Sequence, residues 1–348
     1  MRRRFGARSA ALLGIVALAA TALAVTASVT QASGQAKYVL GLSNTLAGNG
    51  WREGMVCAFK AQAKASGKVS SVRVVHRNTD TAGQIADIRT LISAGVNAIV
   101  INPSSPTALK PVAQQAIARG IKVVFVDQRV NLAGAYNATN DQVAYGRLGA
   151  TWLFKKLGGR GNVVEMRGIA GVPADTDRHK GFMQAKAKYP NIKVVKSVFT
   201  GWQFANGGKQ MLDILNSGVK VDGVWTSGID YTVVNAFRTA HKKLVPVVGA
   251  DNNGFLKQLK GVAKSTGAAV TNPSVIGGVG VTVALKVLNK QSVAKWTKLT
   301  PQVWTWPADK AQINRYAIPG AHADASAQLQ IAGLTTYSLA QYKACKGP

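Results

Sequence analysis

From residue 37 onward, one pattern of apolar and polar positions repeats along the chain. A short run of apolar, often β-branched residues ends at a polar residue, and a longer segment with an apolar stripe follows it. This alternation predicts strands that alternate with helices, and apolar strand interiors are typical of a parallel sheet covered on both faces. The predicted strands are Tyr38–Asn44, Val72–Asn78, Ala98–Asn102, Lys122–Asp127, Asn162–Gly168, Lys193–Thr200, Gly223–Ser227, Pro246–Asp251 and Ala268–Asn272.

The number of strands and the chain length favour two domains over one. The chain has 348 residues, and single domains usually have roughly 100–200. No long linker separates the halves, so we expect two doubly wound α/β lobes joined by a three-crossing hinge, near 139–141, 272–273 and 300–301. The lobes expected are residues 37–139 with 273–299, and 140–272 with 300–320, followed by a C-terminal tail, 321–348. The predicted helices include Trp51–Ser66, Ala82–Ala94, Thr107–Arg119, Tyr145–Leu157 and Val233–His241.

The first 36 residues have the pattern of a targeting segment. Arginines near the start precede an apolar run from Ala10 to Val29, and small residues then offer cleavage after Ala32 or Ala36. This pattern predicts a secretory signal peptide. The run is long for a signal peptide, so an uncleaved membrane anchor stays open. We therefore expect an exported protein, in the periplasm or at the outer face of the cytoplasmic membrane.

Export changes how the two cysteines are interpreted. Cys57 lies on the first predicted helix and Cys345 lies in the tail. Outside the cytosol they can oxidise to a disulfide that fixes the tail to the first lobe. The alternative is two unrelated small apolar side chains.

The charge of the chain is strongly positive. It has 43 Lys and Arg against 14 Asp and Glu, a formal net charge of +29. Such a charge first suggests nucleic acid, but that function needs a clustered basic surface. The basic residues are dispersed, one or two per predicted helix, so we expect a solvated basic surface and no nucleic-acid partner.

Polar residues at the strand ends indicate a binding cleft. In open parallel sheets, ligands bind beyond the carboxyl ends of the strands, although Asn and Asp there also serve as turns or helix caps. Trp51 opens a predicted helix directly after a glycine-rich segment, and Trp202 lies in another short loop. Both could stack on the C–H face of a sugar ring, whose hydroxyl rim suits Asp, Asn and Arg, and the alternative is that they pack within or between the lobes. The strand-end residues are Asn44, Asn78, Asn102, Asp127, Ser227, Asp251 and Asn272.

The sequence contains no recognised catalytic motif. The nucleophile-elbow, Walker, dinucleotide-binding and zinc-protease patterns are absent, and the histidines lack a second ligand at metal spacing. We therefore predict no enzyme activity, no cofactor and no metal, although a hydrolase with scattered catalytic residues remains an alternative.

The order of several short motifs resembles the exported sugar-binding proteins of ABC transporters, in the ribose-binding branch of the two-lobed periplasmic type I fold. The segment Gly50-Trp51-Arg52 resembles the subgroup that includes galactofuranose binders. The resemblance covers about residues 37–305. The matching motifs are Gly41–Asn44, Gly83–Asp87, Ala98–Pro103, Val126-Asp127, Asn140-Asp141, Gly168–Gly171, Asp177–Phe182 and Val247–Asp251.

The resemblance implies a set of ligand-binding residues. Where the family has Asp-Arg after the fourth strand, this chain has Asp127-Gln128-Arg129, so the residue that reaches the ligand there stays open. Gly228-Ile229-Asp230 replaces a family Asn-Asp and loses a hydroxyl contact, and ribose is no more favoured than another pentose, a hexose or a polyol. The expected ligand-binding residues are Trp51, Arg52, Asn102, Asp127, Arg129, Arg178, Trp202, Asp251 and Asn272.

The resemblance also implies a function. We expect a monomer that captures a monosaccharide or polyol between its lobes and delivers it to the membrane permease subunits of an ABC importer. The alternatives are a repressor-like core that senses a ligand, which needs a DNA-binding headpiece where the signal lies, and a binding protein that presents its ligand to a chemoreceptor without transport.

Overall fold

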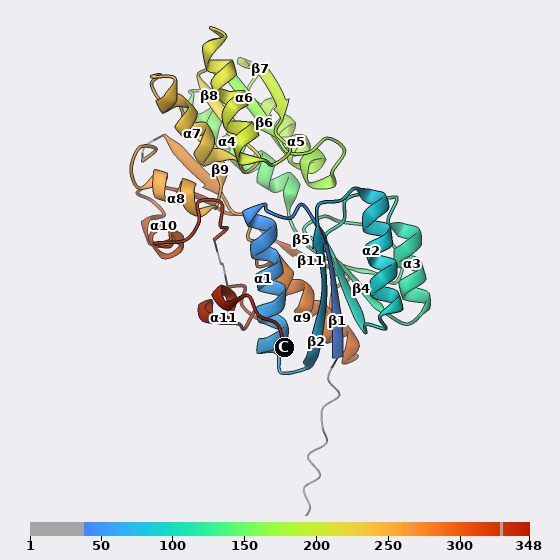
Figure 1. The fold of residues 1–348 in the computed structure, drawn as a ribbon. Helices are drawn as coiled ribbons and strands as arrows, with labels where there is room; N and C mark the ends of the chain where they lie inside the picture. The colour runs from blue at the N-terminus through green and yellow to red at the C-terminus, as the bar shows by residue number, and fades with distance from the viewer. Residues whose placement is uncertain (1–37, 265, 328–329) are drawn as a thin grey trace, which may run out of the picture. The chain divides into compact units, whose positions relative to one another are not determined.

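The computed structural model describes residues 38–264, 266–327 and 330–348, and the predicted signal peptide lies outside these ranges. The described part of the chain folds around two six-stranded sheets (Figure 1). The first is parallel throughout, in the order β11-β5-β4-β3-β1-β2. Its strands are β1 (Tyr38–Thr45), β2 (Val69–Arg77), β3 (Ala98–Ile101), β4 (Lys122–Val126), β5 (Tyr136–Asn140) and β11 (Trp296–Leu299).

The second sheet has the order β12-β10-β9-β8-β6-β7 and is parallel except for the pair β10 and β12. Its strands are β6 (Gly161–Arg167), β7 (Ile192–Phe199), β8 (Gly223–Thr226), β9 (Val247–Ala250), β10 (Gly267–Val270) and β12 (Val303–Thr305).

Helices cover both faces of each sheet because successive strand residues point to opposite sides. In β3, Ala98 and Val100 pack into one core with α1 and α9, whereas Ile99 and Ile101 pack into another with α2 and α3 (Figure 1). In the second sheet, α6, α7, α8 and α10 cover one face, and α4 and α5 the other. The helices are α1 (Gly50–Ala65), α2 (Thr81–Ser93), α3 (Lys110–Ala118), α4 (Gln142–Lys156), α5 (Pro173–Lys186), α6 (Phe204–Asn216), α7 (Asp230–Thr239), α8 (Asn253–Leu259), α9 (Ile276–Leu288), α10 (Lys310–Tyr316) and α11 (Leu339–Ala344).

The chain passes from one sheet to the other at three places. They lie between β5 and α4, between β10 and α9, and between β11 and β12. The crossings are hydrogen-bonded to one another: the Asn140 amide donates to the Thr271 carbonyl at 2.9 Å, and the Asp141 N–H donates to the Leu299 carbonyl at 2.9 Å. The expected two-lobed α/β fold is confirmed, and we call the unit around the first sheet the first lobe and the other the second lobe.

The nine predicted strands each overlap an observed strand, but the pattern missed β5, β11 and β12. The sequence of β5, Tyr136–Asn140, alternates apolar and polar residues without the β-branched run of the other strands. Its Asn137 is nevertheless buried, because that side chain hydrogen-bonds both backbone groups of Val130. The sequence pattern therefore missed β5 because one of its buried residues is a polar side chain whose hydrogen bonds are made inside the fold.

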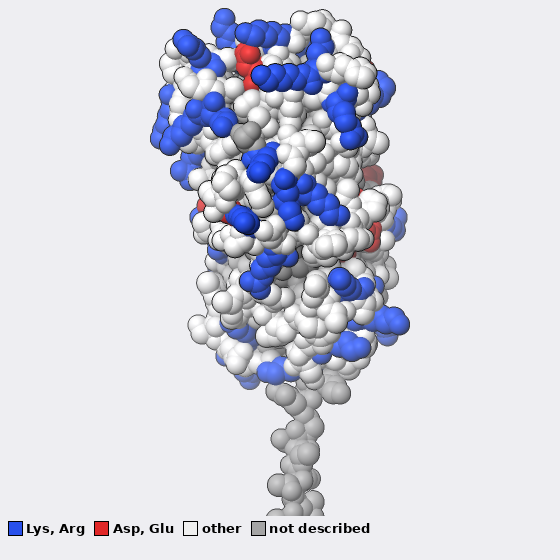
Figure 2. All heavy atoms as spheres, turned by 90° about the vertical axis from the view of Figure 1, so that its left-hand side faces the viewer, with Lys and Arg blue, Asp and Glu red and all other residues white. Residues whose placement is uncertain are grey.

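The described surface is rich in basic side chains. Figure 2 shows Lys and Arg spread widely over one face, with few Asp or Glu among them. Within the ranges that the structure describes, no helix is both long and apolar enough to cross a membrane.

Candidate functional site

A cavity with about 620 Å³ of empty space, its mouth included, opens between the lobes. Its walls include residues within two positions of the ends of strands in both sheets: Asp127 after β4, Ser227 after β8, Asp251 after β9 and Asn272 after β10. The cavity thus lies beyond the carboxyl ends of the strands, where parallel sheets bind ligands.

Seven of the nine predicted residues line this cavity. They come from both lobes and from the hinge, so the fold brings together positions up to 221 residues apart in sequence. These residues are Trp51, Arg52, Asp127, Arg178, Trp202, Asp251 and Asn272.

The two tryptophans are fixed by hydrogen bonds from their indole N–H groups. In the first turn of α1, Trp51 donates to the Asn272 carbonyl oxygen at 2.6 Å. Trp202 donates to the carbonyl oxygen of Ser227 at 3.0 Å, and a β carbon on Gly168 would lie 2.2 Å from its ring. Both tryptophans line the cavity, and each ring has a guanidinium over it: that of Arg52 lies 5.7 Å from the centre of Trp51, and that of Arg178 lies 5.9 Å from the centre of Trp202.

A chain of polar contacts crosses the floor of the cavity. Gln142 connects Asp127 and Arg178, because its amide donates to the Asp127 Oδ1 at 2.8 Å while its oxygen accepts from the Arg178 Nε at 2.8 Å. Arg52 donates to the Asn44 side chain at 2.9 Å. Burial raises the pKa of Asp127 and lowers the pKa of Arg52 to about 10, while the nearby arginine charges favour the ionised form of Asp127.

Backbone strain accumulates around the same cavity. Three lining residues without a glycine's freedom have positive φ: Leu46 at 61°, Asp127 at 64° and Trp202 at 53°. Left-handed conformations of this kind cost free energy and tend to occur at functional sites. The strain supports a binding role for the loops after β1, β4 and β7.

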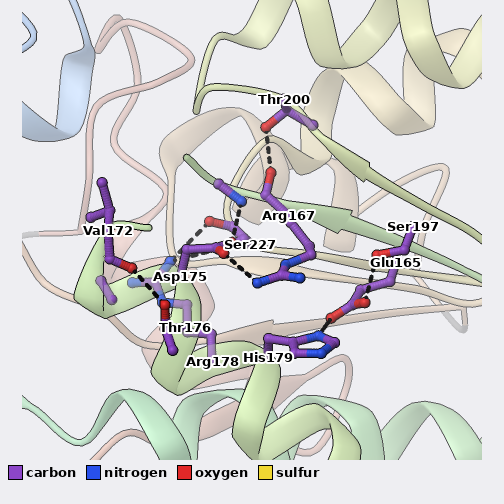
Figure 3. A network of polar contacts seen from close by, with 12 residues as sticks. Glu165, Arg167, Val172, Asp175, Thr176, Arg178, His179, Ser197, Thr200 and Ser227 are labelled. Carbon is purple, nitrogen blue, oxygen red and sulfur yellow. Dashed lines mark hydrogen bonds and ion pairs between the residues drawn. The ribbon is translucent and has the colours of Figure 1, made fainter. Parts of the chain in front are cut away.

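Arg178 is positioned by the first turns of α5 (Figure 3). Buried Asp175 accepts the Gly168 N–H at 2.7 Å and the Arg167 guanidinium at 2.6 Å, which fixes α5 to the end of β6. The Arg178 guanidinium then donates to the Ser227 carbonyl at 2.9 Å and lies 4.2 Å from the centre of the Tyr145 ring. Asp175 thus supports the arginine rather than lining the cavity.

Asp251 has an unused hydrogen-bond acceptor. Its Oδ1 accepts the Asn272 N–H at 3.0 Å, whereas its Oδ2 is buried and has no hydrogen-bond partner in the described part of the chain. Burial and the neighbouring Asp230 raise the pKa of Asp251 to about 7. A buried carboxylate oxygen without a partner is costly, so a ligand hydroxyl that donates to it would recover that free energy.

Asp230 has a supporting role. It accepts hydrogen bonds from the Ala250 N–H at 2.6 Å and from the Asn252 side-chain amide, so it contacts the residues on both sides of Asp251. Ser227, a strand-end residue, and Gly228, the first residue of the segment that replaces the family's Asn-Asp pair, line the cavity.

The structure does not bring Asn102 and Arg129 to the cavity, which corrects the prediction for both. Asn102 is fully buried, and its side-chain oxygen accepts from Gln128 at 3.1 Å. Arg129 is exposed, with its guanidinium 4.2 Å from the centre of the Trp296 ring. The pattern marked Asn102 as a strand end but could not show that its amide is used by a neighbouring side chain.

Several lining residues were missed by the sequence analysis. Asn49 could have been found, since it directly precedes Gly50 and Trp51 in the loop. Asp324 and Ser326 gave no signal, because nothing in the tail's pattern relates it to a strand end. The missed residues are Leu46, Asn49, Ala174, Phe204, Gly228, Ala250, Asn252, Asp324 and Ser326.

Cys57 and Cys345 form a disulfide in this structure, with Cα atoms 4.5 Å apart. It joins α1 to the end of α11. Across 38–264, 266–327 and 330–348, no three His, Cys, Asp or Glu residues are grouped so that they could hold a metal ion.

Two doubly wound lobes, three hinge crossings and a polar, tryptophan-lined cavity between them define a two-lobed binding protein. The chain belongs to the periplasmic binding protein family: the model of the periplasmic binding protein domain matches residues 40–292. The family resemblance expected from the sequence motifs is thereby confirmed.

Individual proteins support this assignment. The chain is 30% identical over 239 residues to a xylitol-binding protein of Mycolicibacterium smegmatis, a match that covers 66% of each chain. It is 29% identical to the crystal structure of an ABC transporter solute binding protein from Thermobispora bispora, with a TM-score of 0.78 over 85% of this chain and 92% of that one.

A further solved structure is the periplasmic component of the arabinose ABC transporter from Shewanella, bound to L-arabinofuranose. It is 27% identical, with a TM-score of 0.72 over 79% of this chain and 94% of that one. These relatives are binding proteins.

Proposed function

We propose that the protein captures a monosaccharide or polyol between its two lobes and delivers it to an ABC importer. One observation carries this proposal: Trp51 of the first lobe and Trp202 of the second line the same cavity as Asp251, a residue with an unpaired carboxylate oxygen. Flat apolar rings and hydrogen-bonding groups in one cavity match the C–H faces and hydroxyl rim of a small polyhydroxylated molecule. Similarity to proteins named for xylitol and arabinose supports the same ligand class.

The arginines and carboxylates suit hydroxyl groups because each hydroxyl both donates and accepts. Asp127 and Asp251 offer acceptors, and Arg52 and Arg178 offer charged donors. Charge-assisted hydrogen bonds in a closed cavity are stronger than neutral ones. Micromolar binding, about −8 kcal/mol, is the affinity expected of such a site.

Capture is coupled to a hinge motion. The open lobes admit the ligand, which contacts both and favours the closed form in proportion to its tighter binding there. The permease subunits of the importer then recognise the closed, loaded form. Under this proposal the protein is exported, acts as a monomer and catalyses no reaction.

Isothermal titration calorimetry against pentoses, hexoses and polyols tests the proposal. We expect one or a few of these compounds to bind at micromolar or lower Kd, and Asp251→Ala to weaken binding by at least about tenfold. The proposal fails if neither the refolded nor the natively purified protein binds any pentose, hexose or polyol of the panel.

A further inference from the structure

Residues 321–348, which we call the C-terminal strap, lie beyond the segment matched by the family model. The described parts of the strap contact both lobes and contribute two residues, Asp324 and Ser326, to the wall of the cavity. The strap is therefore part of the candidate binding site as well as an extension of the fold.

The start of the strap is bound to the second lobe beside Asp251. The N–H groups of Asn253 and Gly254 donate to the carbonyl oxygens of Ala325 and Ala323 at 2.8 and 2.6 Å. In return, the Ala327 N–H donates to the carbonyl oxygen of Asp251 at 2.9 Å. This part of the strap thus runs antiparallel to the segment that contains Asp251, as the bridge between Asn252 and Ser326 shows.

The end of the strap is bound to the first lobe. Gln62 on α1 makes two hydrogen bonds to Thr336, of 3.0 and 2.8 Å, and Thr282 on α9 donates to the Leu334 carbonyl at 2.6 Å. The Cys57–Cys345 disulfide adds a covalent attachment (Figure 1 shows α11 beside α1). Because both ends are held, the position of Asp324 at the cavity is set by the fold.

Asp324 reaches from the strap to the first turn of α1. Its Oδ2 accepts the Gly50 N–H at 3.2 Å, and its side chain is only 13% exposed. Any β carbon at position 50 would lie 2.5 Å from the Asp324 carboxyl carbon, so only glycine permits this approach. The carboxylate also makes a short contact with exposed His322.

A carboxylate at a helix N-terminus is often only a cap. Here the same carboxylate lines the cavity together with Trp51 on that helix turn, and each carboxylate oxygen can accept more than one hydrogen bond. A capping role predicts an effect on stability alone, whereas a binding role predicts an effect on which ligands are preferred.

We propose that Asp324 is a ligand-contacting residue that determines specificity, by accepting a hydroxyl from the edge of the sugar or polyol nearest the first turn of α1. This proposal rests on the proposed function. The strap then favours ligands with a hydroxyl at that position and disfavours analogues that lack it, because the largely covered Asp324 carboxylate would lose a hydrogen bond without replacement.

The test compares wild type, Asp324→Asn and Asp324→Ala by calorimetry, using the best ligand of the panel and its monodeoxy analogues. Asp213→Asn is the matched control, because Asp213 is an exposed carboxylate on α6, away from the cavity lining. We expect both Asp324 variants to bind the parent ligand at least about tenfold more weakly, about 1.4 kcal/mol, and the control to match wild type.

For wild type, one monodeoxy analogue should bind at least about tenfold more weakly than the parent ligand. For Asp324→Ala, that analogue and the parent ligand should bind with equal affinity, because the carboxylate that distinguishes them is gone. The proposal is overturned if both Asp324 variants rank all analogues as wild type does, whatever happens to their thermal stability. Failure of the proposed function looks different, since wild type itself would then bind no sugar or polyol.

Discussion

The side-chain amide of Asn49 donates a 2.9 Å hydrogen bond to the carbonyl oxygen of Trp202. These residues belong to different lobes and both line the cavity. A second contact joins the lobes, because the Ala174 N–H of α5 donates to the Gln128 side chain at 3.2 Å. The structure therefore shows the lobes in contact on two sides of the cavity.

Gln128→Ala should weaken ligand binding indirectly. Gln128 does not line the cavity, but its side chain accepts a hydrogen bond from Ala174 of the other lobe. We expect a loss of about three- to tenfold in affinity, as the closed form becomes less populated. Calorimetry gives the affinity, and small-angle scattering should show a larger radius of gyration for the unliganded variant. Gln115→Ala, on an exposed site of α3, is the control. Equal affinities would refute a closing role for Gln128.

Trp202→Ala should reduce affinity by at least about tenfold, because it removes the ring face offered to the ligand. Trp202→Phe keeps an aromatic ring and should therefore lose less affinity for the ligand than Trp202→Ala does. Trp296→Ala is the matched control, since Trp296 is 38% exposed and outside the cavity lining. Titration with the best ligand of the panel measures all three, and unchanged binding by Trp202→Ala would contradict a stacking role.

Arg178→Lys keeps the charge but removes the planar group that bonds Gln142 and Ser227 together. We expect at least about tenfold weaker binding, with most of the loss in the enthalpy measured by calorimetry. The exposed Arg238→Lys on α7 is the comparison. If both variants bind as wild type does, Arg178 acts only as a positive charge.

Binding should become tighter as the pH rises through the pKa of Asp251, about 7 in the unliganded protein. A hydroxyl donates more strongly to the ionised carboxylate, so binding near neutral pH should release protons. Calorimetry in buffers of different ionisation enthalpy measures this release, and Asp251→Asn should abolish it. A pH-independent affinity in wild type would contradict this role of Asp251.

The same raised pKa affects folding in the opposite direction. The folded carboxyl retains its proton at pH values where the unfolded one, with an ordinary pKa, has lost it. The stability contributed is fully present below the ordinary pKa and is lost as the pH rises through about 7. Burial also raises the pKa of Asp230 to about 7, so Asp230 adds to this decline of stability with pH. Urea unfolding of the unliganded protein should therefore show a smaller decline with pH in Asp251→Asn.

Cys57→Ser should lower the free energy of unfolding by about 2–4 kcal/mol, because the reduced chain gains freedom when unfolded. Reductant should lower wild-type stability to that of the variant and should leave the variant unchanged. Urea unfolding with and without reductant measures this. Identical curves for oxidised wild type and Cys57→Ser would show that the bond does not stabilise the fold.

The sequence pattern predicted the sheets and most of the cavity for one physical reason. Parallel strands of one sheet end at a common edge, so Asp251 and Asn272, which follow the neighbouring strands β9 and β10, had to lie near each other once the strands were recognised. Asp127 follows β4 of the other sheet and lines the same cavity because this cavity lies between the two lobes. The pattern could not say which strand-end groups would be used internally, and Asn102 is used by Gln128. Asp324 was beyond prediction because its place depends on a strap held by contacts to both lobes.

The first lobe is completed late in the chain. Its central helix α9 and edge strand β11 follow the whole second lobe up to β10, and Cys345 comes 288 residues after Cys57. During synthesis, strands β6 to β10 of the second sheet are complete before α9, the helix that packs on α1, is made. Most of the second lobe therefore lies between two parts of the first, and the chain returns to the second lobe at β12 and α10. The disulfide can form only after residue 345 has been synthesised, so it joins one of the earliest helices to one of the latest segments described.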